Sequence, residues 1–431
     1  MDIKKIGDVK FIDGGVCASK GFRANGIQCG LAHKPLTDTE KNSAESNNAL
    51  PSAKKKNDLA LIVADKDCTA AAVYTTNKVK GAPIIVTKKH LENGIARAII
   101  VNSVNANTCN PDGIEKANKM CELTANQLGI DVNDVIVAST GVIGQILPIE
   151  PIANGMQELA DGLTYDGNKR ALEAIMTTDT KPKEIALEFK AGGKTCTIGG
   201  MLKGSGMIHP NMATTLTFIT TDTDISAELL QRALSDTVKV TLNRASVDGD
   251  TSTNDMVCIM ASGSAGNKPI THENEDFEAF ENALYNIMMN LARMMAGDGE
   301  GATKLIECVV SDAETEKIAE TVAKSVITSS LFKTAMFGED ANWGRILCAI
   351  GYADADFDVN KVDVKISSKN GCIHVCKNGA GVDFSEETAK KVLSEDEIQI
   401  IISLGNGAGS AVAWGCDLTY DYVKINGDYR S

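Results

Sequence analysis

Long apolar runs are absent from this sequence of 431 residues. No stretch approaches the ~18 consecutive apolar residues that indicate a membrane-spanning helix. The opening segment, MDIKKIGDVKFIDGG, lacks the apolar core of a secretory signal peptide. The 12 cysteines are scattered singly and do not form the framework of a disulfide-rich protein. These absences predict a cytoplasmic protein with reduced thiols.

Positive charge is also scarce, because 43 Lys and Arg face 57 Asp and Glu, for a net charge of -14. An acidic chain repels phosphate groups, which disfavours nucleic acids and anionic membranes as partners. The sequence contains neither a Walker-type phosphate loop nor a serine nucleophile elbow. Its hydrophobic fraction of 43% is ordinary for a globular protein. The length predicts two or three domains, or one large α/β unit.

Short apolar runs and longer helical patterns alternate along the chain, which predicts an α/β or α+β fold. The expected strands are 58–65, 83–86, 96–102, 134–139 and 398–404. The expected helices are 114–128, 149–160, 168–176, 226–244, 274–296, 313–326 and 341–350. The polar stretch 36–57 is expected to be an exposed insertion.

A glycine-rich loop meets a strand at Thr214. Residues 203–213 (KGSGMIHPNMA) contain three loop-forming Gly and Pro residues, and TTLTFITT follows them with almost only β-branched or aromatic residues. A pliable loop can distort a peptide bond while the strand holds an attacking hydroxyl, which is the arrangement that a self-cleaving precursor needs. On its own, however, a threonine that opens a strand is usually a structural residue.

The segment KGSGMIHPNMATTLTFITTD (203–222) resembles the self-processing segment of the ornithine acetyltransferases, also called bifunctional glutamate N-acetyltransferases. Further stretches resemble the same family in the same order. They are STGVIG (139–144), MTTDTKPK (176–183), SVDGDTSTND (246–255), GEGATKLIE (299–307), KTAMFGEDANWGRILCAIGYA (333–353) and WGCDLTYDYVKINGDYRS (414–431). The resemblance extends over nearly the whole chain outside 36–57 and implies the α/β fold of that family.

The resemblance implies self-cleavage between Ala213 and Thr214. The expected products are an N-terminal chain, 1–213, and a C-terminal chain, 214–431, which stay together as a heterotetramer of two cleaved pairs. Cleavage would free the α-amine of Thr214, whose usual pKa of about 7.7–8.0 suits it to act as base for its own hydroxyl. Before cleavage that nitrogen is an amide, so processing would also activate the enzyme.

The resemblance also assigns the other site residues. Thr140 and Gly141 would form an oxyanion hole, although a strand-ending turn is the ordinary interpretation of such a pair. Lys203 would bind a substrate carboxylate, although a single lysine is usually a solvated surface residue. The matching substrate-contacting positions are Thr177, Lys203, Thr214, Glu300, Asn426 and Ser431.

The implied reaction is a ping-pong transfer of acetyl from N2-acetyl-L-ornithine to L-glutamate through acetyl-Thr214, in arginine biosynthesis. The small-molecule substrates need no cofactor or metal, and the sequence leaves open whether acetyl-CoA is a second donor. Two alternatives are an N-terminal-threonine amidohydrolase or aminopeptidase, and an uncleaved binding protein. The amidohydrolase would release acetate without glutamate, whereas the binding protein would run as a single chain.

Two other patterns are set aside. Cys372, His374 and Cys376 would share one face of a strand, but their cysteines would lie roughly 13 Å apart, too far for one zinc ion. The glycines of 405–409 lack dinucleotide-binding spacing and are expected to form a turn. Departures from the family pattern include Val104, where glycine is usual, and Pro111, which put the geometry of their loop in doubt.

Overall fold

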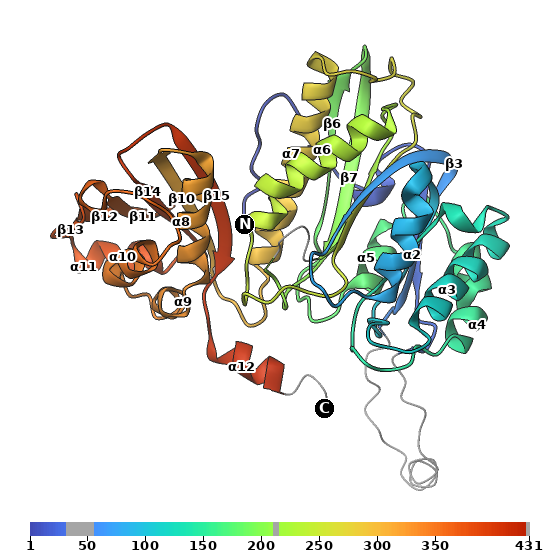
Figure 1. Cartoon of the computed structure of the whole chain (residues 1–431), viewed down its shortest axis with the longest axis horizontal. Coiled ribbons are helices and arrows are strands. Elements are labelled where there is room, and N and C mark those ends of the chain that lie inside the picture. Colours follow the sequence, from blue (N-terminus) through green and yellow to red (C-terminus); the bar gives the residue numbers. More distant parts are fainter. Residues whose placement is uncertain (32–55, 210–214, 428–431) are drawn as a thin grey trace, which may run out of the picture.

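Two helix-covered β-sheets make up the protein (Figure 1). The computed structural model describes residues 1–31, 56–209 and 215–427. Mixed sheets combined with helices confirm the predicted α/β class. Nearly all of the predicted insertion at 36–57 lies outside the described residues. Within the described ranges, no helix has the length and apolar character needed to cross a membrane.

The larger sheet has nine strands, in the order β1-β6-β7-β8-β9-β3-β4-β5, with β2 paired to β3. Its strands are β1 (Lys10–Ile12), β2 (Phe22–Ile27), β3 (Leu59–Tyr74), β4 (Ile95–Asn102), β5 (Val135–Ser139), β6 (Glu184–Ala191), β7 (Lys194–Lys203), β8 (Leu216–Thr221) and β9 (Met256–Ala261). The β4–β5 and β8–β9 pairs are parallel, and the other pairs of this sheet are antiparallel. The ends of β5, β7 and β8 are important because the candidate site residues follow or precede them.

Helices cover both faces of this sheet (Figure 1). They are α2 (Ala82–His90), α3 (Gly113–Leu128), α4 (Glu150–Asp161), α5 (Asn168–Ile175), α6 (Ala227–Val240) and α7 (Glu275–Ala296). Successive side chains of strand β3 point to opposite faces of the sheet and so contribute to two separate cores. Leu59, Leu61 and Val63 join the core under α3 and α4, whereas Ala60 and Ile62 join the core on the opposite face.

The smaller sheet has six strands, in the order β13-β12-β11-β14-β10-β15. These strands are β10 (Leu305–Ala313), β11 (Asp363–Ser368), β12 (Gly371–Lys377), β13 (Ala380–Gly381), β14 (Glu397–Ser403) and β15 (Gly409–Cys416). Its helices are α8 (Glu316–Thr328), α9 (Ser330–Phe337), α10 (Trp343–Gly351), α11 (Glu386–Leu393) and α12 (Tyr420–Gly427). Helix α12 leaves this sheet after β15 and carries the end of the described chain (Figure 1).

The prediction of a strand at 83–86 is wrong, because these residues belong to α2. Gly81 precedes the helix and Pro83 lies in its first turn, where the missing proline N–H costs no hydrogen bond. Ile84 and Val86 are buried while Ile85 is 52% exposed. Four consecutive apolar residues do not distinguish a buried strand from a short helix.

The expected placement of Cys372, His374 and Cys376 on one face is also wrong. A register shift in the β11–β12 pair makes Cys376 pair with Val364 while His374 pairs with Lys365. The bulge turns Cys376 into the core, whereas Cys372 is exposed. The predicted turn at 405–409 is confirmed, since residues 405–408 lie in the connection between β14 and β15 and Gly409 begins β15.

Candidate active site

One pocket, with a volume of about 280 Å³, brings together six of the predicted site residues. They are Thr140, Gly141, Thr177, Lys203, Glu300 and Asn426. These residues come from segments spread from the end of β5 to α12, so only the folded chain places them together. Thr214 and Ser431 lie outside the described residues. Thr215, which is bonded to Thr214, lines a small cavity that also contacts Thr140 and Lys203.

Gly141 occupies a position that no other residue could take without movement. Its φ is +125°, and a Cβ would lie 2.1 Å from the Val104 carbonyl oxygen. Val142 donates its N–H to that same oxygen at 3.0 Å, and Ala106 donates back to Val142 at 3.0 Å. The chain after β5 is therefore held tightly against the loop after β4. Val104, where the family usually has glycine, has no left-handed backbone and is accommodated.

Lys203 is the last residue of β7, and its ammonium donates to the Thr140 hydroxyl at 3.3 Å. Burial lowers the pKa of Lys203, while the carboxylates of Asp179, Asp255 and Glu300 act in the opposite direction. Because the Thr140 hydroxyl accepts this bond, its own proton can be donated to another oxygen in the pocket.

A buried ion-pair cluster holds the segment before β6 against the start of the 203–209 loop. Lys183 bonds to Asp179 at 2.7 Å and to Asp298 at 2.5 Å. Asp179 also accepts the N–H groups of Thr177, at 2.9 Å, and Gly204, at 2.8 Å. Burial opposes ionisation of Asp179, but the neighbouring lysines outweigh it and hold its pKa well below the usual range.

Glu300 lies in the connection between α7 and β10 and links α12 to the pocket. Its side chain is 8% exposed, and one carboxylate oxygen accepts the Asn426 amide at 2.7 Å. Its backbone N–H donates to Ser205 at 2.8 Å. A Cβ on Gly206 would lie 2.3 Å from the Glu300 carboxyl carbon, so the glycine allows this close approach. The carboxylate is thus positioned to meet a cationic group in the pocket.

The described part of the 203–213 loop is fixed by the segment before β9. Asp248 accepts the N–H groups of Met207, at 2.6 Å, and Ile208, at 2.8 Å. Thr251 donates its hydroxyl to the His209 carbonyl at 2.7 Å. Burial lowers the pKa of His209, which favours the neutral ring. The loop is therefore anchored up to the last residue described before Pro210.

Three residues without a predicted role also line the pocket: Ser252, Thr253 and Asn254. The Asn254 amide donates to the Ala106 and Ser139 carbonyls, at 2.6 and 3.0 Å. It therefore joins the loop after β4, the end of β5 and the start of β9. The signal available in the sequence was the SVDGDTSTND motif, which contains all three residues.

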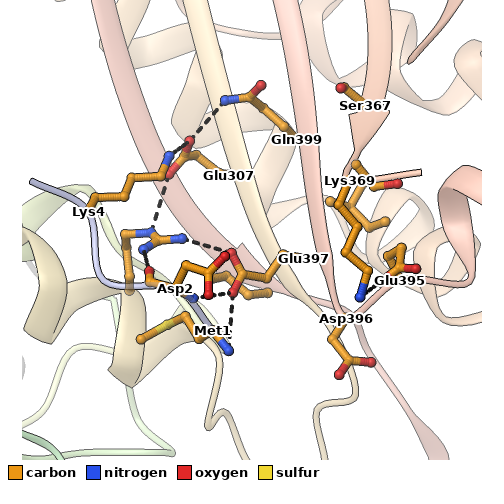
Figure 2. Close-up of a pocket in the computed structure, with 14 residues that line it drawn as sticks. Met1, Asp2, Lys4, Glu307, Ser367, Lys369, Glu395, Asp396, Glu397 and Gln399 are labelled. Carbon is orange, nitrogen blue, oxygen red and sulfur yellow. Dashed lines mark hydrogen bonds and ion pairs between the residues drawn. The ribbon is translucent and has the colours of Figure 1, made fainter. Parts of the chain in front are cut away.

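A larger cavity of about 380 Å³ lies elsewhere, between the N-terminal residues and the edge of the second sheet. Figure 2 shows that the Lys4 side chain reaches Glu307 and that Glu397 lies beside the N-terminal residues Met1 and Asp2. Arg293 also pairs with Glu397, at 2.9 Å. None of the six predicted site residues that the structure describes lines it. The charged side chains around this cavity form an ion-pair cluster that ties the N-terminal segment to α7, β10 and β14.

Among the described residues, no three His, Cys, Asp or Glu side chains are grouped as metal ligands. The pocket instead offers a lysine ammonium, a carboxylate, hydroxyl groups and backbone N–H groups. These groups can bind a zwitterionic amino acid and stabilise negative charge on an oxygen.

Comparison with known proteins places this chain in a family. The ArgJ family profile matches residues 45–431. The arginine biosynthesis bifunctional protein ArgJ 1 of Clostridium acetobutylicum is 49% identical, over 93% of this chain and 98% of its own length. The ArgJ protein of Caldanaerobacter subterraneus is 46% identical, over 98% of this chain and 100% of its own length.

Solved structures of similar proteins cover about half of the chain. A Bacillus halodurans protein described as arginine biosynthesis bifunctional protein ArgJ is 48% identical over 49% of this chain and 98% of its own, with a TM-score of 0.47. An ornithine acetyltransferase from Mycobacterium tuberculosis, solved in complex with ornithine, is 33% identical over 48% of this chain and 100% of its own, with a TM-score of 0.41. The extent and identity of the full-length matches show that this chain belongs to the ArgJ family of arginine-biosynthesis proteins.

Proposed function

We propose that this pocket transfers acetyl from N2-acetyl-L-ornithine to L-glutamate through an acetyl ester on Thr214. The observation that carries the proposal is the convergence of six predicted residues in one pocket of about 280 Å³. Relatives named as bifunctional arginine-biosynthesis proteins support the enzyme class, that of a glutamate N-acetyltransferase. A protein similar to this chain was solved in complex with ornithine, the product that the proposed donor would leave.

Self-cleavage comes first in the proposed sequence of events. The Thr214 hydroxyl attacks the Ala213 carbonyl, the acyl group moves from nitrogen to oxygen, and water hydrolyses the ester. The chain then consists of fragments 1–213 and 214–431, and Thr214 carries a free amine that can accept the proton of its own hydroxyl. The hydrogen bonds that the Met207 and Ile208 N–H groups donate to Asp248 support this step, because they fix the segment that leads to the cleaved bond.

In the acetylation step, the Thr214 oxygen attacks the acetyl carbonyl of the donor. Negative charge develops on the carbonyl oxygen, where the Gly141 N–H and the Thr140 hydroxyl can stabilise it. Collapse breaks the amide bond, and the Thr214 amine returns the proton to the leaving nitrogen of ornithine. Glutamate then attacks the ester in the same way, and N-acetylglutamate leaves. One amide replaces another, so no nucleotide is needed.

The remaining groups suit amino-acid substrates. Lys203 can pair with the α-carboxylate, which is common to both substrates, and Glu300 can pair with the side-chain ammonium of ornithine. Thr177 and Asn426 would complete the contacts, and Ser431 would contribute from the chain end. The two substrates bind in turn, so one pocket serves both.

The cleaved pairs would assemble as a heterotetramer in the cytoplasm, without a cofactor, and acetyl-CoA would be a second donor only if the enzyme is bifunctional. An acceptor and donor panel with the purified protein tests the activity. Transfer from N2-acetylornithine to glutamate supports the proposal. Rapid release of acetate without glutamate would identify an amidohydrolase instead.

A further inference from the structure

Asp255 has a buried carboxyl oxygen that no described hydrogen-bonding group satisfies. The residue immediately precedes β9, and its side chain is 3% exposed. Its Oδ2 atom is buried without a hydrogen-bond partner. A buried polar atom without a partner is costly, so its persistence calls for a physical explanation.

A cavity of about 20 Å³ provides that explanation. Asp255, Lys203, Ser252 and Thr140 all line it. A polar cavity of this size holds one water molecule, which needs two to four polar partners. Lys203, Ser252 and Thr140 also line the candidate active-site pocket of about 280 Å³, whereas Asp255 does not. Asp255 is therefore separated from the substrate space by the groups that face it.

The two groups through which Asp255 can act are Ser252 and Lys203. Ser252 and Lys203 line the same small cavity as Asp255, and both favour the charged form of the Asp255 carboxyl. Burial raises the pKa of Asp255 well above its usual range, while Ser252 and Lys203 oppose this shift. Two separated groups that share a one-water cavity are suited to a water-mediated contact.

Other charges also act on Lys203. The carboxylates of Asp179 and Glu300 raise its pKa, and the Lys183 and Lys56 ammonium groups oppose its charge. Asp179 is already occupied by Lys183, and Glu300 by Asn426. Asp255 is thus the carboxyl group near Lys203 whose second oxygen has no described partner.

We propose that Asp255 is a positioning residue for acetyl transfer, which holds Lys203 as an ammonium facing the substrate pocket through Ser252 and one water. The inference rests on the proposed function. Asp255 does not touch the substrate. Its effect on the reaction passes through the charge and the orientation of Lys203, and therefore concerns the binding of the substrate carboxylate.

The test compares Asp255→Asn with Asp222→Asn in the full-length, cleaved enzyme. Asp222 is also buried, with burial raising its pKa, but it follows β8 at the opposite end of the parallel β8–β9 pair. Steady-state transfer between N2-acetylornithine and glutamate is measured from pH 6 to 10. We expect Asp255→Asn to raise KM about tenfold, the loss of one charged hydrogen bond. The alkaline limb of its kcat/KM profile should move about one pH unit lower, because Lys203 loses a carboxylate that favours its charged form.

A double-mutant cycle separates positioning from a merely structural role. In a Lys203→Met background, Asp255→Asn should reduce kcat/KM less than about twofold further, because both changes remove the same interaction. Full additivity, or an alkaline limb that does not move, would overturn the inference. If Asp255→Asn does not fold, Ser252→Ala gives the same test with a smaller expected shift.

Failure of the proposed function would look different. A wild-type enzyme that transfers no acetyl to glutamate would refute the proposed activity, whatever the variants do. The role of Asp255 would then be judged by calorimetric binding of L-ornithine. Asp255→Asn should weaken that binding about tenfold through Lys203, and unchanged affinity would refute the positioning role.

Discussion

The substitution Gly141→Ala offers a sharp test of the oxyanion hole. At this position the added methyl would lie 2.1 Å from the Val104 oxygen and 2.2 Å from the Val104 carbonyl carbon. The φ of +125° would also be strained for any residue with a Cβ. The 139–142 turn must therefore move by about 1 Å, and the Gly141 N–H would move with it. A displacement of this size can reduce a rate about a hundredfold.

The expected magnitude follows from the role of that N–H. Loss of one oxyanion donor typically lowers kcat by about 10²–10³, whereas left-handed strain on its own costs about 1–3 kcal/mol of stability. Gly144→Ala is a matched control in the same turn, with φ +78° and no atom within 4 Å of the added methyl. It should lower the melting temperature by a few degrees and leave kcat nearly unchanged.

The assay measures transfer from N2-acetylornithine to glutamate at saturating substrate. Activity is normalised to the cleaved fraction on a denaturing gel, so a slow self-cleavage step does not imitate a catalytic defect. Circular dichroism establishes that both variants are folded. A folded Gly141→Ala variant with kcat within about threefold of Gly144→Ala, far from the loss typical of a missing oxyanion donor, would refute the oxyanion role.

Three further predictions follow from the site. Thr214→Ala should give one full-length band on a denaturing gel, and two fragments from this variant would exclude Thr214 as the cleaving nucleophile. Lys183→Met should lower the free energy of unfolding, measured with urea, by about 3–5 kcal/mol, because Asp179 and Asp298 stay buried without their cation. Since the pKa of Asp179 is depressed in the folded protein, the difference between variant and wild type should shrink as the pH falls. A difference that does not depend on pH would count against the pairing. Glu300→Gln should raise KM for N2-acetylornithine more than for glutamate, and equal changes would remove Glu300 from ornithine recognition.

The sequence predicted long elements better than short ones. The helix expected at 274–296 is α7, and the strand expected at 96–102 is β4. The β6–β7 hairpin was missed, although Gly192 and Gly193 at its turn both have positive φ and form a recognisable hairpin signal. The run at 83–86 forms a helix because Gly81, before the run, and Pro83, its first residue, start one.

The candidate site was predictable only where a motif existed. Thr140, Lys203 and Glu300 were found by resemblance, and the structure brings them into one pocket. Asp255 lies within a recognised motif, but its burial and its cavity depend on the parallel pairing of β8 with β9. Long-range pairing of this kind leaves no pattern in a single sequence, so its consequences could only be seen in the fold.

The most direct test of the central claim uses N2-acetylornithine labelled in its acetyl group and the cleaved enzyme without glutamate. The label should appear on the 214–431 fragment, as an ester on Thr214. Adding glutamate, with no coenzyme A present, should move it into N-acetylglutamate. Label on the 1–213 fragment, or transfer that occurs only when donor and acceptor are bound together, would contradict the Thr214 mechanism.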